Sequence, residues 1–124
     1  MTRARKHLGE HGERYVARML ADGGWHLIDT NWRGAAGEVD IIADDGQAIV
    51  FVEVKTRRGE SMGRAEESIT PAKARRLLEL ASEYVSLHPG LDGRYWRIDL
   101  AALTLDRSGR IVRYSHIRDA CLDE

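Results

Sequence analysis

The sequence predicts a single-domain α/β protein with a mixed central sheet flanked by two helices, in the order αβββαββ. Three observations support this class. The 124 residues are the size of one domain, and no repeat or low-complexity linker divides them. Two segments place apolar residues at helical spacing, and five short runs rich in β-branched and aromatic residues end at turn residues. We therefore expect one core and no second domain.

The first predicted helix spans residues 7–22, where apolar side chains recur at helical spacing, and Gly23-Gly24 ends it. Residues 1–6 carry a charge of +3 and are predicted to form a flexible basic tail. The second helix begins with Thr70 as N-cap and Pro71 as its first helical residue, and it ends at His88-Pro89-Gly90. Its predicted apolar stripe comprises Ala74, Leu77, Leu78, Ala81, Tyr84 and Val85.

The predicted strands form a meander before the second helix and a hairpin after it. They span residues 25–33, 38–43, 48–57, 94–103 and 110–117. A Gly-Ala-Ala-Gly turn joins the first two, and an Asp-Asp-Gly turn joins the second to the third. The helices would then cover opposite faces of the sheet or share one face.

Composition argues against membrane and secretory classes. No apolar run approaches the ~18 residues of a membrane span, and the basic start has no apolar segment behind it. The single cysteine, Cys121, suits a reducing compartment. We therefore expect a cytoplasmic protein with no membrane partner.

Two carboxylates stand inside predicted strands, where their burial is costly. Glu53 and Lys55 share one strand face by alternation, and Asp40 lies in the preceding strand. A two-residue turn at Asp45-Gly46 would place Asp40 diagonal to Glu53 on the same face. A four-residue loop preserves that parity, whereas a three-residue loop reverses it.

Converging carboxylates favour a Mg²⁺ or Mn²⁺ site, because hard cations prefer oxygen ligands. Such an ion, held by Asp40 and Glu53, would polarise a scissile phosphate and lower the pKa of a bound water. Lys55 would orient that water or stabilise developing charge. Glu13 lies at the edge of the first helix's apolar stripe and either reaches the metal or its waters, or is an exposed acid near the helix N-terminus.

Charge is segregated along the chain in a way that suits a nucleic-acid ligand. Residues 7–54 carry −6, whereas residues 55–76 carry +4. Arg57 and Arg58 either bind phosphate or are solvated loop charges. Lys73 and Arg76 either contact phosphate or form a solvated helix face. Trp32 either stacks on a base or belongs to the core.

Two further patterns have alternative interpretations. His7 and His11 match the H-x-x-E-H zinc pattern, although no third ligand is evident near them. Asp99 is another carboxylate in an apolar strand, and it either lies near the site or forms a structural ion pair with an arginine.

The helix glutamate, the strand aspartate and the Glu53-Val54-Lys55 run resemble the PD-(D/E)xK nuclease superfamily and its archaeal Holliday-junction resolvases. The segments GERYVARML, TNWRGAAGEVDIIA, VFVEVKTR, ITPAKARRL and YWRIDL look like the YraN-like family of small bacterial proteins. The resemblance implies a restriction-endonuclease-like fold, a metal at Asp40 and Glu53, and a catalytic role for Lys55. Glu13 matches the resolvases' N-terminal glutamate, while Val39 replaces the proline of the named motif.

We therefore predict a divalent-metal-dependent DNA endonuclease that acts on branched or otherwise non-regular DNA. A resolvase-like homodimer would provide the two sites that two coordinated cuts need. The Val54 backbone carbonyl is expected to join Asp40 and Glu53 at the metal. The alternatives are a non-catalytic nucleic-acid-binding or adaptor protein with the same fold, and an interaction module whose polar strand face is solvated.

Overall fold

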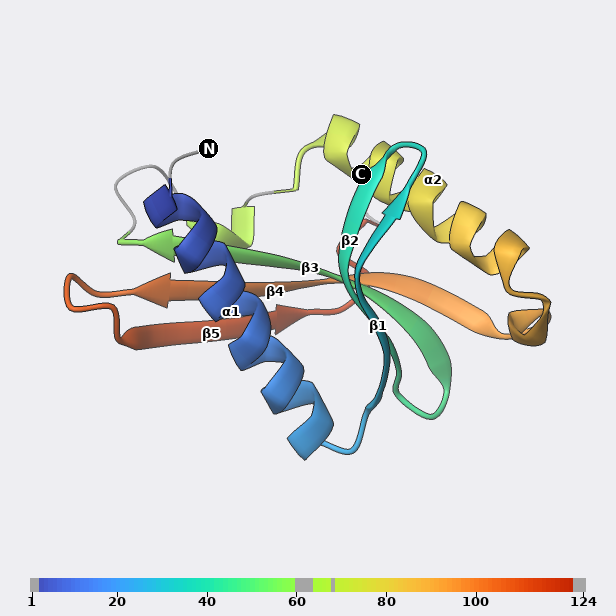
Figure 1. The fold of residues 1–124 in the computed structure, drawn as a ribbon, viewed down its shortest axis with the longest axis horizontal. Coiled ribbons are helices and arrows are strands. Elements are labelled where there is room, and N and C mark those ends of the chain that lie inside the picture. The colour runs from blue at the N-terminus through green and yellow to red at the C-terminus, as the bar shows by residue number, and fades with distance from the viewer. Residues whose placement is uncertain (1–2, 60–63, 68, 122–124) are drawn as a thin grey trace.

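The five strands form one mixed sheet in the order β1-β2-β3-β4-β5. The computed structural model describes residues 3–59, 64–67 and 69–121. The strands are β1 (His26–Gly34), β2 (Gly37–Asp44), β3 (Ala48–Arg58), β4 (Tyr95–Leu105) and β5 (Ile111–Ile117). Only β3 and β4 run parallel, and α2 (Pro71–Leu87) supplies the crossover that a parallel pair requires. The predicted α/β class and element order are confirmed (Figure 1).

Helix α1 (Arg3–Asp22) begins four residues earlier than predicted, so residues 3–6 of the predicted tail belong to it. The run Arg-Ala-Arg-Lys consists of strong helix formers, which explains the longer helix. Single-turn 3₁₀ helices, η1 (Ala65–Glu67) and η2 (Pro89–Leu91), flank α2. Thr70 caps α2 as predicted, since its side chain accepts a hydrogen bond from the Lys73 backbone N–H at 3.2 Å.

The two helices cover opposite faces of the sheet, which decides between the two predicted arrangements (Figure 1). On one face, Val16 and Leu20 of α1 pack on Val50 and Val52. On the other face, α2 packs on Ile49 and Phe51. Strand alternation therefore sorts the side chains of β3 between two cores as predicted.

The predicted apolar stripe of α2 is wrong at one position. Leu78 is 41% exposed, whereas Leu80, which was not predicted, is fully buried. Leu77, Leu80, Ala81 and Tyr84 form the buried i, i+3, i+4, i+7 set. Leu78 lies about 100° around the helix from Leu77, which turns it out of the contact with the sheet.

The β2–β3 loop has four residues, one of the lengths that the sequence left open. Asp44 pairs with Ile49, so residues 45–48 separate the pair. The Asp45 side chain accepts hydrogen bonds from the backbone N–H groups of Gln47 and Ala48, both at 2.8 Å, and these bonds stabilise the wider loop. In this register Asp40 corresponds to Glu53 directly, not diagonally, and the predicted parity is preserved.

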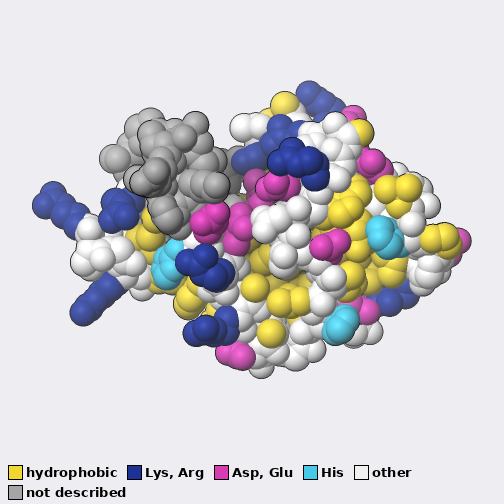
Figure 2. Space-filling model, viewed as in Figure 1, with side chains coloured by type: hydrophobic (Ala, Val, Ile, Leu, Met, Phe, Trp, Pro, Cys, Tyr) yellow, Lys and Arg dark blue, Asp and Glu magenta, His cyan; other side chains and the backbone are white. Residues whose placement is uncertain are grey.

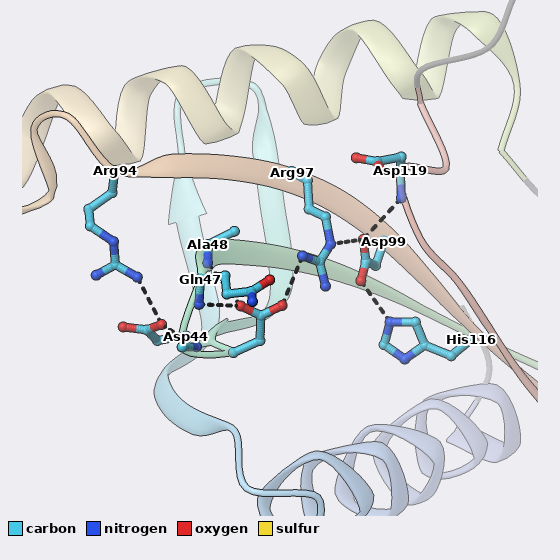
Figure 3. A network of polar contacts seen from close by, with 10 residues as sticks. Asp44, Gln47, Ala48, Arg94, Arg97, Asp99, His116 and Asp119 are labelled. Carbon is cyan, nitrogen blue, oxygen red and sulfur yellow. Dashed lines mark hydrogen bonds and ion pairs between the residues drawn. The ribbon is translucent and has the colours of Figure 1, made fainter.

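The α1-side face of β4 carries a buried polar network (Figure 3). The fully buried Asp99 carboxylate accepts hydrogen bonds from Arg97 Nε at 3.0 Å, from the Asp119 N–H at 3.1 Å and from His116 Nε2 at 2.7 Å. Arg97 also pairs with Asp45 at 2.8 Å. Burial acts to raise the pKa of Asp99, but the hydrogen bonds from His116 and Arg97 outweigh it and the pKa is lowered. Asp99 therefore has the structural ion-pair role that was one of its two predicted alternatives.

Gly12 of α1 packs directly against β3. A Cβ added there would overlap the Thr56 hydroxyl of β3. We expect Gly12→Ala to destabilise the protein by roughly 1–3 kcal/mol, because overpacking at this contact outweighs the helix-propensity gain. Gly9→Ala is the matched control, since nothing lies within 4 Å of its added Cβ, and it should be stabilising. Urea denaturation of both variants measures the difference, and equal effects of the two substitutions would contradict the packing argument.

Candidate metal and nucleic-acid site

A pocket of about 430 Å³ lies where the tip of the β1–β2 hairpin meets β3 and α2. Acidic and basic side chains lie side by side on this face of the molecule (Figure 2). The described lining residues are Arg33, Ala36, Gly37, Glu38, Asp40, Glu53 and Arg76. The pocket thus contains both carboxylates that the sequence predicted to converge, together with one of the predicted phosphate-binding arginines.

The pocket opens where β2 separates from β3. Their paired register ends at Ile41 and Val52, one position before Asp40 and Glu53. Beyond that point the Asp40 side chain replaces a backbone partner, because its Oδ2 accepts a hydrogen bond from the Val54 N–H at 2.8 Å. The N–H and C=O of one strand residue point to the same neighbouring strand, so the Val54 carbonyl also faces β2. That is the side from which it would have to contact a metal.

Asp40 has a strongly perturbed acidity. Burial, together with the negative charges of Glu53, Glu13 and Glu38, raises the pKa of Asp40 to about 8, and the hydrogen bond from Val54 opposes this shift. The carboxyl group is therefore largely protonated at neutral pH unless a cation neutralises the site. Perturbed carboxylates of this kind are frequent at functional sites.

Glu53 pairs with Lys73 of α2. The distance from Lys73 Nζ to Glu53 Oε2 is 3.2 Å, and the two side chains are only 23% and 13% exposed. Neither predicted alternative for Lys73, a phosphate contact or a solvated helix face, describes this contact. The solvated-face alternative is therefore wrong, and the phosphate contact stays a prediction. The ion pair was not predicted, because the approach of α2 to β3 depends on tertiary packing and not on the local pattern.

Glu13 and Lys55 lie outside the described lining of the pocket. Glu13 is half-buried on α1, and its Oε1 accepts a hydrogen bond from Asn31 Nδ2 at 2.9 Å. Its charge nevertheless contributes to the raised pKa of Asp40. Lys55 is half-buried, two residues after Glu53 in β3, so alternation places it on the face of Glu53.

The two other predicted phosphate-binding arginines belong to β3, so neither lies in a loop. Arg57 is half-buried, and its Nε has no hydrogen-bond partner among the described residues. Arg58 is exposed and donates to the Arg107 carbonyl at 3.0 Å.

Comparison with known proteins places this arrangement in a family. The model of the uncharacterised protein family UPF0102 matches residues 12–103, a range that includes Glu13, Asp40, Glu53 and Lys55. The chain belongs to the UPF0102 family. It is 44% identical over 117 residues to a UPF0102 protein of Roseiflexus castenholzii, covering 94% of each chain. It is 42% identical over 107 residues to one of Kineococcus radiotolerans, covering 86% of this chain and 88% of the relative. This confirms the predicted YraN-like membership.

One ion pair among the residues that line the pocket was not predicted from the sequence. Arg33 Nη2 lies 3.1 Å from Glu38 Oε2, and the two residues are cross-strand partners on either side of the Gly34–Gly37 turn. Opposite charges on either side of a short hairpin turn could have predicted this pair. Trp32 packs edge to face on Tyr84 with 5.0 Å between ring centroids, which supports the core interpretation over base stacking.

Other predicted features of the UPF0102 chain do not form a site. Across residues 3–59, 64–67 and 69–121, no three or more His, Cys, Asp or Glu side chains form a metal-binding group. His11 is exposed, and the side chain of His7 lies outside the described residues. A cation in the pocket would thus depend on two carboxylates, a backbone carbonyl and water.

Neither α1 nor α2 combines the length and apolar character of a bilayer-spanning helix, as far as the chain is described.

Proposed function

We propose that this UPF0102 protein is a divalent-metal-dependent endonuclease that hydrolyses DNA phosphodiester bonds, with a site of the PD-(D/E)xK type. The observation that carries the proposal is the convergence of Asp40 and Glu53 on one pocket, beside Arg76. Burial and then the charge of Glu53 raise the pKa of Asp40, so a divalent cation would stabilise the charged form of this carboxylate.

The residues present fit Mg²⁺ or Mn²⁺. Mg²⁺ is commonly held by one or two carboxylates with waters and substrate phosphate completing its coordination. Asp40 and Glu53 would supply the carboxylates, and the Val54 carbonyl a further oxygen ligand. When bound, the ion would polarise the scissile phosphate and acidify a water molecule. Glu13 would act through water, since its side chain is held by Asn31 outside the described pocket lining.

The cationic side chains would perform the remaining work. Lys55 follows Glu53 on the same strand face, from which its ammonium would orient the attacking water or stabilise charge on the phosphate. Arg76 at the pocket and Arg57 and Arg58 at the end of β3 would bind backbone phosphates. These contacts would position DNA without reading its sequence.

The likeness to Holliday-junction resolvases extends the proposal to branched or otherwise non-regular DNA. Two coordinated cuts require two sites, so a homodimer would be the working form. We also propose that the protein acts in the cytoplasm.

A cleavage assay tests the proposal. Purified protein is incubated with duplex, single-stranded, flap and four-way-junction DNA in Mg²⁺ or Mn²⁺, with chelator as the control. We expect cleavage that requires metal and falls in Lys55→Ala. The exposed Arg75→Met substitution on α2 should leave the rate unchanged. Cleavage that persists in chelator, or unchanged in Lys55→Ala, would refute the assignment.

One observation favours a second candidate, a non-catalytic nucleic-acid-binding or adaptor protein. The Lys73–Glu53 ion pair already balances one of the two carboxylates without a metal. Salt-dependent DNA binding with no metal-dependent turnover on any of the four substrates would support this alternative.

A further inference from the structure

Lys73 is fixed at the pocket by the start of α2. The Thr70 side chain accepts a hydrogen bond from the Lys73 backbone N–H, and Pro71 begins the helix. Lys73 therefore lies in the first turn, with its ammonium on Glu53 Oε2. Arg76 follows three residues later, on a neighbouring position of the same helix surface, and lines the pocket. One short segment of α2 thus brings two cations to the acidic site.

The acids of the pocket differ in their partners. Glu53 pairs with Lys73 at 3.2 Å, and Glu38 pairs with Arg33 at 3.1 Å. The Asp40 carboxylate accepts a hydrogen bond from the Val54 N–H at 2.8 Å. A metal held by Asp40 and Glu53 would therefore share the Glu53 carboxylate with Lys73, which contacts its Oε2. An ammonium and a divalent cation at the same carboxylate repel each other, so their occupancies oppose one another.

We propose that Lys73 is a DNA-phosphate-binding residue whose ammonium pairs with Glu53 until a divalent metal binds there. The inference rests on the proposed function and adds to it a coupling between metal binding and DNA binding. Metal binding releases Lys73 from Glu53, and the released ammonium binds a backbone phosphate beside Arg76. Lysine suits this exchange, because its charge is compact and its four-carbon side chain is flexible.

The exchange makes two opposite predictions for Lys73→Met. Mn²⁺ affinity without DNA should rise about three- to tenfold, because a competing cation is removed. DNA affinity in Ca²⁺ should fall about three- to tenfold, and the slope of log K against log salt should decrease in magnitude by ~1, because one phosphate contact is lost. The enhancement of DNA binding by Ca²⁺ should also be smaller than in the wild type.

The experiment titrates Mn²⁺ into DNA-free protein, followed by electron paramagnetic resonance of the free ion. It also measures binding of a labelled four-way junction by fluorescence anisotropy in Ca²⁺ at several salt concentrations. Arg75→Met is the matched control, since it removes the same charge from an exposed position of α2. Lys73→Arg keeps the charge and should retain junction affinity. Thermal melts establish that each variant is folded.

The outcomes separate the two levels of the account. Wild-type protein that binds no Mn²⁺ would overturn the proposed function and this inference with it. Wild-type binding with a Mn²⁺ affinity that Lys73→Met changes no more than Arg75→Met would overturn this inference alone. This inference alone would also be overturned if Lys73→Met left the junction affinity and its salt slope unchanged. A gain in metal affinity together with a loss in junction affinity supports the exchange.

Discussion

Replacing Asp40 by Asn should reduce metal-dependent DNA cleavage by on the order of 10²–10³-fold, comparable to the removal of one transition-state-stabilising group. An amide is a poorer ligand for a hard cation than a carboxylate, so the ion would bind weakly and in an altered position. The Asn oxygen can still accept the hydrogen bond that the Val54 N–H gives to Asp40 Oδ2, which should preserve the local fold. Single-turnover cleavage of the preferred substrate measures the effect.

The same substitution tests the charge on Asp40 through stability. The folded-state pKa of about 8 lies above the usual value of 3.8, so the folded protein binds more protons than the unfolded chain between these values. Ionisation of Asp40 therefore lowers stability as pH rises through this window. In metal-free buffer at pH 9, which is above both pKa values, Asp40→Asn should be more stable than the wild type by on the order of 5 kcal/mol. A variant that is less stable at pH 9, or that cleaves DNA at the wild-type rate, would contradict this account of Asp40.

Replacing Asp99 by Ala should destabilise the protein by about 3–5 kcal/mol, the cost of breaking a buried ion pair from one side. Arg97, whose side chain is 8% exposed, would keep Asp45 but lose Asp99, and the Asp119 N–H would lose its acceptor. Urea denaturation measures the loss. Asp22→Ala, at an exposed position at the end of α1, is the control and should stay within about 0.5 kcal/mol of the wild type. A loss below 1 kcal/mol in Asp99→Ala would show that the network is not structurally important.

The convergence of Asp40 and Glu53 could be predicted because strand parity has only two outcomes. A loop of two or four residues after Asp44 places both acids on the same face, and the observed loop has four. The loop length itself could not be predicted. It depends on the hydrogen bonds that the Asp45 side chain accepts from Gln47 and Ala48, and the same sequence is compatible with a tighter turn.

Contacts between distant segments could not be predicted from the sequence. Lys73 and Glu53 meet only because α2 crosses the face of β3 at one particular angle and offset, which local periodicity does not specify. The backbone conformation of Asn31 could not be predicted either. Its φ of 50° and its hydrogen bond to Glu13 depend on the twist of the β1–β2 hairpin and on the position of α1.

The apolar stripe of α2 was predicted with Leu78 and without Leu80, although Leu80 is the buried residue. Leu80 lies three residues after Leu77 and shares its helix face, so helical spacing could have predicted its burial. Thr70 and Pro71 were predicted correctly, because a helix N-terminus is specified by residues adjacent in sequence.

A Mn²⁺ titration of the wild type, Asp40→Asn and Glu53→Gln by isothermal calorimetry at pH 8 tests the central claim most directly. The account predicts one saturable site per chain in the wild type and the loss of that site in both variants. Saturable binding of equal affinity in all three proteins, or none in the wild type at millimolar Mn²⁺, would show that these two carboxylates do not form a metal site.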